Sequence, residues 1–144
     1  MSLSMTEAER QRFLAATRIG VVSVAEPGRG PLTVPVWYHY APGGELRFVT
    51  GRTSRKATLM RAAQRTSLCV QTETAPYSYV SIEGPVVLGD ADYERDVREM
   101  ALRYLGPEIG EAYLAAMHPG GDASNTVLVT LAPERWYSVD YSKM

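Results

Sequence analysis

Short runs of alternating apolar and polar residues dominate the chain and predict a sheet. The runs are rich in β-branched and aromatic residues and are bounded by Gly, Pro or Asn, which is typical of strands joined by turns. We expect strands at residues 19–24, 32–40, 45–50, 66–74, 77–88, 126–131 and 136–141. Tight turns join the first three, so we expect them to form an antiparallel meander. Pro35 cannot donate a ladder hydrogen bond, which places a sheet edge or a bulge there.

Two segments lack this alternation and are predicted to be helices. Residues 4–7 read Ser-Met-Thr-Glu, a capping box in which Ser4 is the N-cap of a helix of about 12 residues. Residues 55–65 are rich in Ala, Leu, Met and Arg, which favour a second helix. Thr53 or Ser54 is its expected N-cap.

A third helical region follows the long strand, which we expect to bend at Gly84-Pro85. Asp90 is the expected N-cap, and apolar residues then recur at helical spacing as far as residue 105. Gly106 should end this helix, and Pro107 suits the first position of a shorter one that ends near Met117.

These elements together predict an α+β fold that is mainly β. We expect one antiparallel sheet of six to seven strands, with peripheral helices, curled into a barrel or a partly open barrel. No internal repeat or linker divides the chain, so we interpret residues 1–144 as a single domain.

Composition excludes several kinds of site. The 144 residues carry 15 Lys and Arg against 16 Asp and Glu, a net charge of −1, which argues against general binding of nucleic acids. The single cysteine, Cys69, excludes an internal disulfide and disfavours a structural zinc site. No apolar run reaches the roughly 18 residues of a membrane span, and no signal peptide is recognisable. We therefore expect a soluble, cytoplasmic protein with no membrane partner.

Catalytic side chains are not apparent. The chain has no Gly-x-Ser-x-Gly motif, P-loop or Gly-x-Gly-x-x-Gly turn. Its two histidines, His39 and His118, are far apart and have no metal-ligand spacing, and we interpret Cys69 as a small buried hydrophobe within a strand. We predict no catalytic side chain and no metal site. If the protein is an enzyme, a bound cofactor must supply the chemistry.

One basic segment stands out where the third strand ends and the second helix begins. Residues 50–56 contain three cations and three hydroxyl groups: Arg52, Arg55, Lys56, Thr50, Thr53 and Ser54. Cations in the first turn of a helix oppose the helix dipole. An anion bound there would remove the conflict, because free backbone N–H groups and charged side chains could hold it. The segment therefore indicates either a phosphate site or an ordinary solvated helix start.

The order of these segments resembles the pyridoxamine 5'-phosphate oxidase-related superfamily, whose members are split-barrel proteins that bind flavins or deazaflavins. The resemblance spans roughly residues 8–140 and is strongest to the small actinobacterial members, which include deazaflavin-dependent reductases. It is carried in order by Thr33-Val34-Pro35-Val36-Trp37-Tyr38, Phe48-Val49-Thr50, Ser54-Arg55-Lys56, Ser67-Leu68-Cys69-Val70 and Val80-Ser81-Ile82-Glu83-Gly84.

The resemblance implies a split β-barrel of the FMN-binding type. It also implies an oxidoreductase that binds FMN or the deazaflavin F-420 and transfers hydride to or from a small organic substrate. The cofactor site would lie between the two subunits of a homodimer. A deazaflavin has a longer, acidic tail, for which Arg52, Arg61 and Arg65 are candidate contacts.

Positions in the family's motifs imply the cofactor contacts in this chain. Arg55 and Lys56 would hold the phosphate, and the aromatic residues would border the ring. Gln71 and residues 77–79 would complete the pocket, in part from a second subunit. The full set of implied contacts is Pro35, Val36, Trp37, Tyr38, Val49, Thr50, Ser54, Arg55, Lys56, Gln71, Tyr77, Tyr79 and Trp136.

Two other classes of function stay open on the sequence. The chain lacks the longer C-terminal substrate segment of the founding enzyme, so we do not expect oxidation of pyridoxamine phosphate. A non-catalytic module that stores or senses a flavin or haem is one alternative. A structural domain with a merely solvated basic turn is the other.

Overall fold

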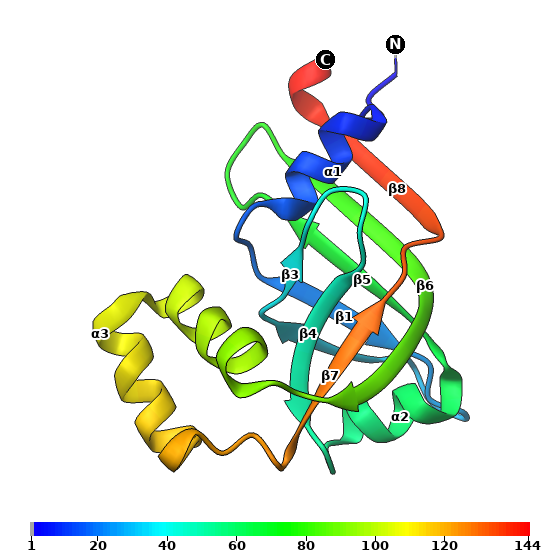
Figure 1. Ribbon diagram of the computed structural model, residues 1–144. Helices are drawn as coiled ribbons and strands as arrows, with labels where there is room; N and C mark the ends of the chain where they lie inside the picture. Colours follow the sequence, from blue (N-terminus) through cyan, green and yellow to red (C-terminus); the bar gives the residue numbers. More distant parts are fainter. Residues whose placement is uncertain (1) are drawn as a thin grey trace.

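Eight antiparallel strands form a sheet that curls into a half-open barrel, with helices around its outside (Figure 1). This arrangement is seen in a computed structural model that describes residues 2–144. The strands lie in the order β2-β1-β5-β6-β7-β4-β3, and β8 pairs with β6. The expected α+β split barrel is confirmed. The strands are β1 (Gly20–Val24), β2 (Leu32–Val36), β3 (His39–Tyr40), β4 (Leu46–Gly51), β5 (Arg65–Gln71), β6 (Ser78–Asp90), β7 (Thr126–Leu131) and β8 (Arg135–Asp140).

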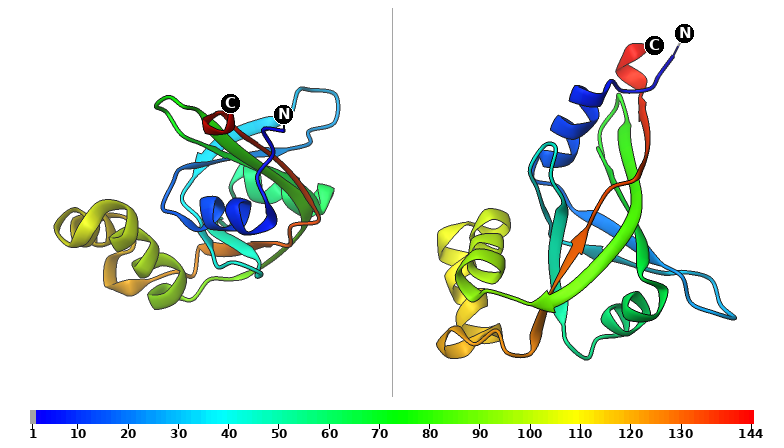
Figure 2. Two further views of the ribbon diagram at one scale, coloured as in Figure 1. Left: turned by 90° about the horizontal axis from the view of Figure 1, so that it is seen from above. Right: turned by 45° about the vertical axis from the view of Figure 1, so that its right-hand side comes forward.

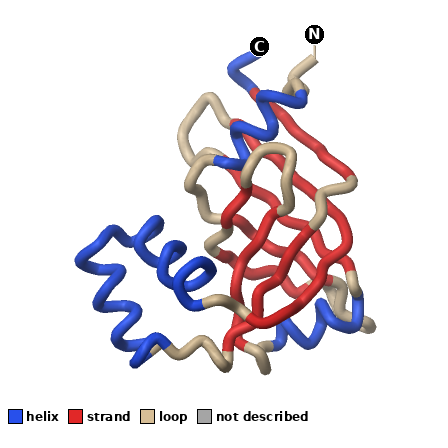
Figure 3. Tube along the Cα trace, in the orientation of Figure 1, coloured by secondary structure: helices blue, strands red, loops and turns tan. Residues whose placement is uncertain are grey.

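The long strand β6 joins the two halves of the barrel (Figure 3). Residues 78–83 pair with β8 and residues 79–85 with β5, whereas residues 86–90 pair with β7. The change of partner occurs at the bend predicted for Gly84-Pro85. A side chain at Gly84 would overlap the carbonyl oxygen of Ala132, so only glycine lets the two backbones approach this closely.

The first three predicted strands make the expected antiparallel pairs, β1 with β2 and β3 with β4, but they do not form one continuous meander. The predicted second strand is two strands, because Trp37 and Tyr38 separate β2 from β3. β2 pairs only with β1 and forms the sheet edge that Pro35 requires, while β3 pairs with β4 in the other half of the barrel. The cause is a tertiary contact. The hydroxyl of Tyr104 accepts the backbone N–H of Tyr38 at 3.1 Å, in place of a neighbouring strand.

Helices α1 (Glu7–Ala15) and α2 (Arg55–Ala63) flank the two ends of the barrel, and a further helical segment extends from its side (Figure 1 and Figure 2). The other helical segments are the π-helical η1 (Tyr93–Arg98) and α3 (Glu99–Met117), with short 3₁₀ turns η2 (Pro119–Gly121) and η3 (Tyr141–Lys143). We call η1 and α3 together the helical arm, which projects beside the barrel (Figure 2). As predicted, the arm breaks at Gly106, whose φ is 80°. Among residues 2–144, none of the helices has the length and apolar character needed to cross a membrane.

Two predicted helix caps are each displaced by two residues. Thr6 rather than Ser4 caps α1, and it forms the capping box with Glu9. Met5 explains the shift, because its side chain is buried and its N–H bonds Ser138 Oγ of β8 at 3.0 Å. Residues before Thr6 are thereby held outside the helix. Asp92 rather than Asp90 caps the arm, since Asp90 still pairs in β6.

The bend in β6 can be tested with two glycines of the same strand. We expect Gly84→Ala to lower the free energy of unfolding by about 3 kcal/mol, because the added methyl group forces two backbones apart. Gly89→Ala is the matched control, since nothing lies within 4 Å of a side chain built there. Its effect should stay within about 0.5 kcal/mol. Urea denaturation measures both, and equal effects of the two changes would contradict the role of Gly84.

Candidate functional site

A cleft opens where the barrel meets the helical arm. Its volume is about 510 Å³, within the range of roughly 300–1,000 Å³ that small-molecule sites occupy. β2 and the residues after it, β4, α2 and α3 all contribute to its wall. The lining residues are Ile19, Pro35, Val36, Trp37, Val49, Lys56 and Tyr113. Five of the predicted cofactor contacts therefore meet in one cleft.

Tyr113 and Ile19 also line this cleft and were missed at the sequence level. Tyr113 lies on α3, and its ring packs on Trp37 with 5.3 Å between centroids. The sequence predicted a helix that ends near Met117, but no local pattern shows that this helix folds back toward residue 37. Ile19 precedes β1 and is largely exposed.

Trp37 and Tyr38 point to opposite sides of the chain. The Trp37 ring stacks on Tyr104 of α3, with centroids 5.4 Å apart and planes 11° apart, and faces the cleft. The Tyr38 side chain is fully buried in the barrel, and its hydroxyl donates to the carbonyl oxygen of Leu14 at 2.7 Å. Burial raises the pKa of Tyr38 above its ordinary value. The structure thus brings Trp37 into the cleft and places Tyr38 in the core.

The start of α2 is organised by two hydroxyl groups that were predicted to contact the cofactor. Ser54 is the N-cap: its Oγ accepts the N–H of Ala57 at 3.2 Å and lies 2.9 Å from Oγ1 of Thr50, which is itself buried. These hydroxyls hold the helix start in place. Within residues 2–144, the backbone N–H groups of Arg55 and Lys56 have no acceptor, as is usual for a first helical turn.

Most of the basic residues around α2 already have partners within the chain. Arg55 is half exposed and forms an ion pair with Glu26, whose side chain is nearly buried. The remaining arginine contacts are Arg52 with Asp90 at 2.7 Å, Arg61 with the carbonyl oxygen of Arg52 at 3.1 Å, and Arg65 with Glu83 at 2.7 Å and Glu134 at 2.6 Å. Lys56 is different, because it forms no ion pair among the described residues and it faces the cleft. Of the two predicted phosphate contacts, Lys56 is the one that is available.

The other predicted contacts lie away from this cleft. Gln71 lines a neighbouring cleft of about 620 Å³, which shares Ile19 with the first. Tyr77 is exposed, and Tyr79 packs against Tyr137 on the outer face of the sheet. Trp136 lies on β8, where its ring meets Tyr40 edge-on at 6.0 Å. Within one chain the structure does not bring these residues to the cleft lined by Trp37 and Lys56.

The outer face of β1, β5, β6 and β8 carries several of these residues. We call it the outer sheet face and define it by Val21, Cys69, Tyr79 and Tyr137, which lie on adjoining strands. Cys69 is half-buried there, not fully buried as the sequence suggested. Large apolar side chains on an exposed sheet are typical of an interaction surface.

The sequence model of the family described as "Pyridoxamine 5'-phosphate oxidase" matches residues 6–140. The chain belongs to the pyridoxamine 5'-phosphate oxidase family. No protein with a curated description matches it.

Solved structures share the fold of this family member over nearly its whole length. The conserved hypothetical protein Rv2991 from Mycobacterium tuberculosis is 25% identical, with a TM-score of 0.77, over 98% of this chain and 88% of that one. A protein described as F420 reductase is 20% identical, with a TM-score of 0.72, over 88% and 94% of the two chains. A pyridoxamine 5'-phosphate oxidase-related, FMN binding protein from Nostoc punctiforme is 18% identical, with a TM-score of 0.64, over 94% and 81%.

In this pyridoxamine 5'-phosphate oxidase family member, Asp96 holds together the first turn of the arm that carries Tyr113. Its carboxylate is fully buried and accepts the backbone N–H of Asp92 at 2.7 Å and two N–H groups of Arg95 at 2.8 and 2.9 Å. Burial alone would raise the pKa of Asp96. The bonds from Arg95 and Asp92 and the charges of Arg95 and Arg47 outweigh it, so the pKa lies below its ordinary value.

The lowered pKa makes the stability of the arm depend on pH. A carboxyl group whose folded pKa is depressed stabilises the fold above its unfolded pKa, and this contribution is lost as pH falls through the folded pKa. We expect Asp96→Asn to lower the free energy of unfolding by about 3 kcal/mol at pH 7 and to weaken the loss of stability below pH 4. Glu111→Gln, which removes an exposed partner of Arg98, should cost less than about 1 kcal/mol. Denaturation curves from pH 3 to 7 test this prediction. It would be contradicted if Asp96→Asn lost as much unfolding free energy below pH 4 as the wild type does.

Proposed function

We propose that this protein is an oxidoreductase that binds FMN or the deazaflavin F-420 in the cleft between the barrel and the helical arm. The observation that carries the proposal is Lys56. Among residues 2–144 it forms no ion pair, and it lies in the first turn of α2 beside free backbone N–H groups, in a cleft walled by Trp37 and Tyr113. Membership of the family supports the same conclusion.

The residues of the cleft suit the two parts of such a cofactor. Lys56 and the first-turn amides of α2 would bind the phosphate, where the helix dipole also favours negative charge. Trp37, Val49 and Tyr113 offer apolar and aromatic surface for the ring system. When bound, the ring supplies hydride transfer to or from a small organic substrate. The chain's own contribution is to bind and orient the ring and to exclude water from one of its faces.

The choice between FMN and the deazaflavin depends on the acidic tail of the latter. Arg52 and Arg65 were candidate contacts for that tail, but both already bond carboxylates of the chain. Within the described part of the chain, Arg61 donates only to a backbone carbonyl oxygen, so no carboxylate there neutralises its charge. The shared ring and phosphate suit the cleft in both cases. We therefore propose a flavin-type cofactor, which is either FMN or F-420.

We further propose that the protein acts as a homodimer through the outer sheet face. Gln71 and Tyr79, which one chain does not bring to its own cleft, lie on or beside this face. A second copy would cover the exposed apolar side chains and could supply these two residues to the site. The neighbouring cleft at Gln71 shares Ile19 with the cofactor cleft, so the face and the site are continuous.

Cofactor binding provides the direct test of function. We expect the purified protein to bind FMN or F-420, seen as a change in visible absorption and fluorescence on titration. Lys56→Gln should weaken binding about tenfold to a hundredfold, because a charge-assisted bond to phosphate contributes roughly 1.5–3 kcal/mol. Arg65→Gln is the matched control: its guanidinium is held by Glu83 and Glu134, so affinity should not change. Binding of neither cofactor would refute the proposal, and binding without turnover would indicate a carrier.

The dimer is tested by charge placed on the outer sheet face. Tyr137 is 64% exposed on that face, and we expect Tyr137→Arg to convert a dimer into a monomer in light scattering. Val87→Arg is the control, since Val87 is 69% exposed but lies outside the face that we define. The monomeric variant should also bind cofactor more weakly if the partner completes the site. A wild-type monomer at micromolar concentration would overturn this part of the proposal.

A further inference from the structure

A second, smaller cleft lies farther along the strands that line the cofactor cleft. Its volume is about 270 Å³, below the roughly 300–1,000 Å³ of sites for drug-sized ligands, so only a small ligand would fit. It lies between the β3–β4 ladder and the helical arm. The lining residues are His39, Arg47, Arg95, Glu99, Met100 and Arg103. None of them lines the cofactor cleft.

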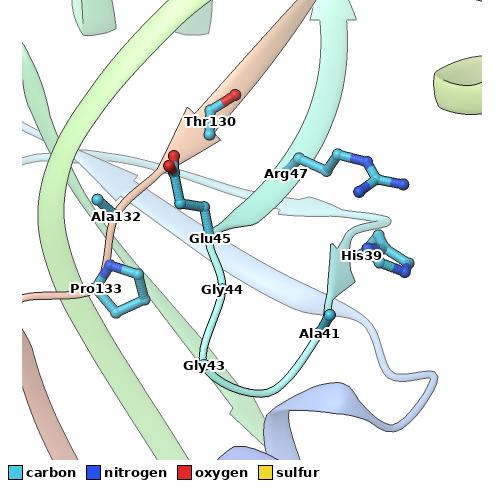
Figure 4. A pocket seen from close by; sticks show the side chains of 9 residues that line it. All are labelled: His39, Ala41, Gly43, Gly44, Glu45, Arg47, Thr130, Ala132 and Pro133. Carbon is cyan, nitrogen blue, oxygen red and sulfur yellow. The ribbon is translucent and has the colours of Figure 1, made fainter.

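Two buried nitrogen atoms in this cleft have no hydrogen-bond partner among residues 2–144. They are Nδ1 of His39 and Nε of Arg47, on residues that lie opposite each other in the β3–β4 register. Figure 4 shows both side chains on the same side of the ladder, at the edge of a wider cleft of about 570 Å³. A buried nitrogen without a partner is costly, so such atoms point to something that binds there.

Arg47 is the more informative of the two. Its side chain is 27% exposed, and it forms no hydrogen bond to any described residue. Its Nε lies 3.7 Å from Oδ1 of Asp96, which is beyond hydrogen-bond distance. The carboxylate of Asp96 is already occupied by Arg95 and by the N–H of Asp92. The guanidinium of Arg47 is therefore charged, largely buried and without a hydrogen-bonded acceptor.

The other charges around the cleft leave it positive. Arg103 is fixed by Thr17 Oγ1 at 2.8 Å and the carbonyl oxygen of Ala15 at 2.9 Å, which are neutral acceptors and leave its charge in place. Among the residues that line the cleft, three arginines, Arg47, Arg95 and Arg103, outnumber the one carboxylate, Glu99. Asp96 and Asp92 lie beside Arg95 and offset mainly its charge. Burial and the charges of Arg47 and Arg103 lower the pKa of His39, while Glu99 raises it. The imidazole is therefore neutral at pH 7 in a positive surrounding.

We propose that this cleft is a binding site for a small oxyanion, either a phosphate or a carboxylate group, with Arg47 as its main ligand. A guanidinium matches two oxygens of such a group with parallel N–H bonds, and these are stronger than bonds between neutral groups. The remaining N–H groups of Arg103 lie at the same cleft as further donors, and His39 Nδ1 becomes one when the bound anion protonates the ring. The site is separate from the proposed cofactor site and does not depend on it.

The two histidines of the chain make the test direct. His39 lines the cleft, whereas His118 lies at the end of the arm, where its Nδ1 is 3.1 Å from the carbonyl oxygen of Asp122. We would follow the imidazole C–H signals by proton NMR, assigned with His118→Gln, while adding inorganic phosphate or acetate at constant ionic strength. We expect a saturable shift of the His39 signal and a rise of its pKa by about one unit, since a nearby anion favours the charged ring. The His118 signal should not respond.

Two variants distinguish anion binding at this site from binding in the cofactor cleft and from a general effect of salt. Lys56→Gln should leave the His39 response intact, even where it abolishes cofactor binding, so the two proposals fail independently. Arg47→Gln should raise the anion concentration for a half-maximal shift of the His39 signal at least tenfold. If Arg47→Gln does not fold, Arg47→Lys keeps the charge but loses the paired donors, and it should weaken the response severalfold.

The response to each anion identifies the ligand class. A response to phosphate alone assigns a phosphate group, a response to acetate alone assigns a carboxylate, and a response to both assigns a general oxyanion site. No response to either anion at 50 mM would mean that water satisfies these nitrogens, and it would overturn the proposal. An equal response in wild type and Arg47→Gln would overturn it as well.

Discussion

The hydroxyl group of Tyr104 holds together the parts of this molecule that build its sites. It accepts the backbone N–H of Tyr38 and lies 2.6 Å from the carbonyl oxygen of Arg18, to which it can donate. These bonds satisfy backbone groups that would otherwise need a neighbouring strand. They end β2, separate it from β3 and dock the helical arm against the barrel. The ring of the same tyrosine stacks on Trp37, which lines the larger of the two clefts.

Both clefts follow from this junction. Successive residues of an extended chain face opposite sides, so Trp37 and His39 project toward the arm while Tyr38 and Tyr40 enter the core. β4 contributes Val49 to the larger cleft and Arg47 to the smaller one in the same way. The arm completes the larger cleft with Tyr113 and the smaller one with Arg95 and Arg103. A single docking contact thereby produces one apolar cleft with a lysine and one small basic cleft.

Charge neutralisation decides which basic residues are available to a ligand. Arg55 and Arg65 are as conspicuous in the sequence as Lys56, but each is paired with glutamate in the fold. Arg47 is an isolated cation in a strand, yet its Nε is buried without a hydrogen bond among residues 2–144, and its ion pair there is the 3.7 Å contact with Asp96, a carboxylate that Arg95 already binds. Pairing depends on residues distant in the chain, such as Glu26 and Glu134, and no local pattern can show it.

The sequence by itself determined the strands, the bend at Gly84, the break at Gly106 and the basic start of α2, since these follow from local backbone chemistry and hydrophobic periodicity. It also indicated five residues of the larger cleft, through the order of motifs shared with the family. The tertiary structure alone decided the separation of β2 from β3, the inward turn of Tyr38, the place of Tyr113 in the cleft and the pairing of Arg55. Each of these depends on a contact between residues far apart in the chain, where a specific hydrogen bond or ion pair outweighs the local pattern.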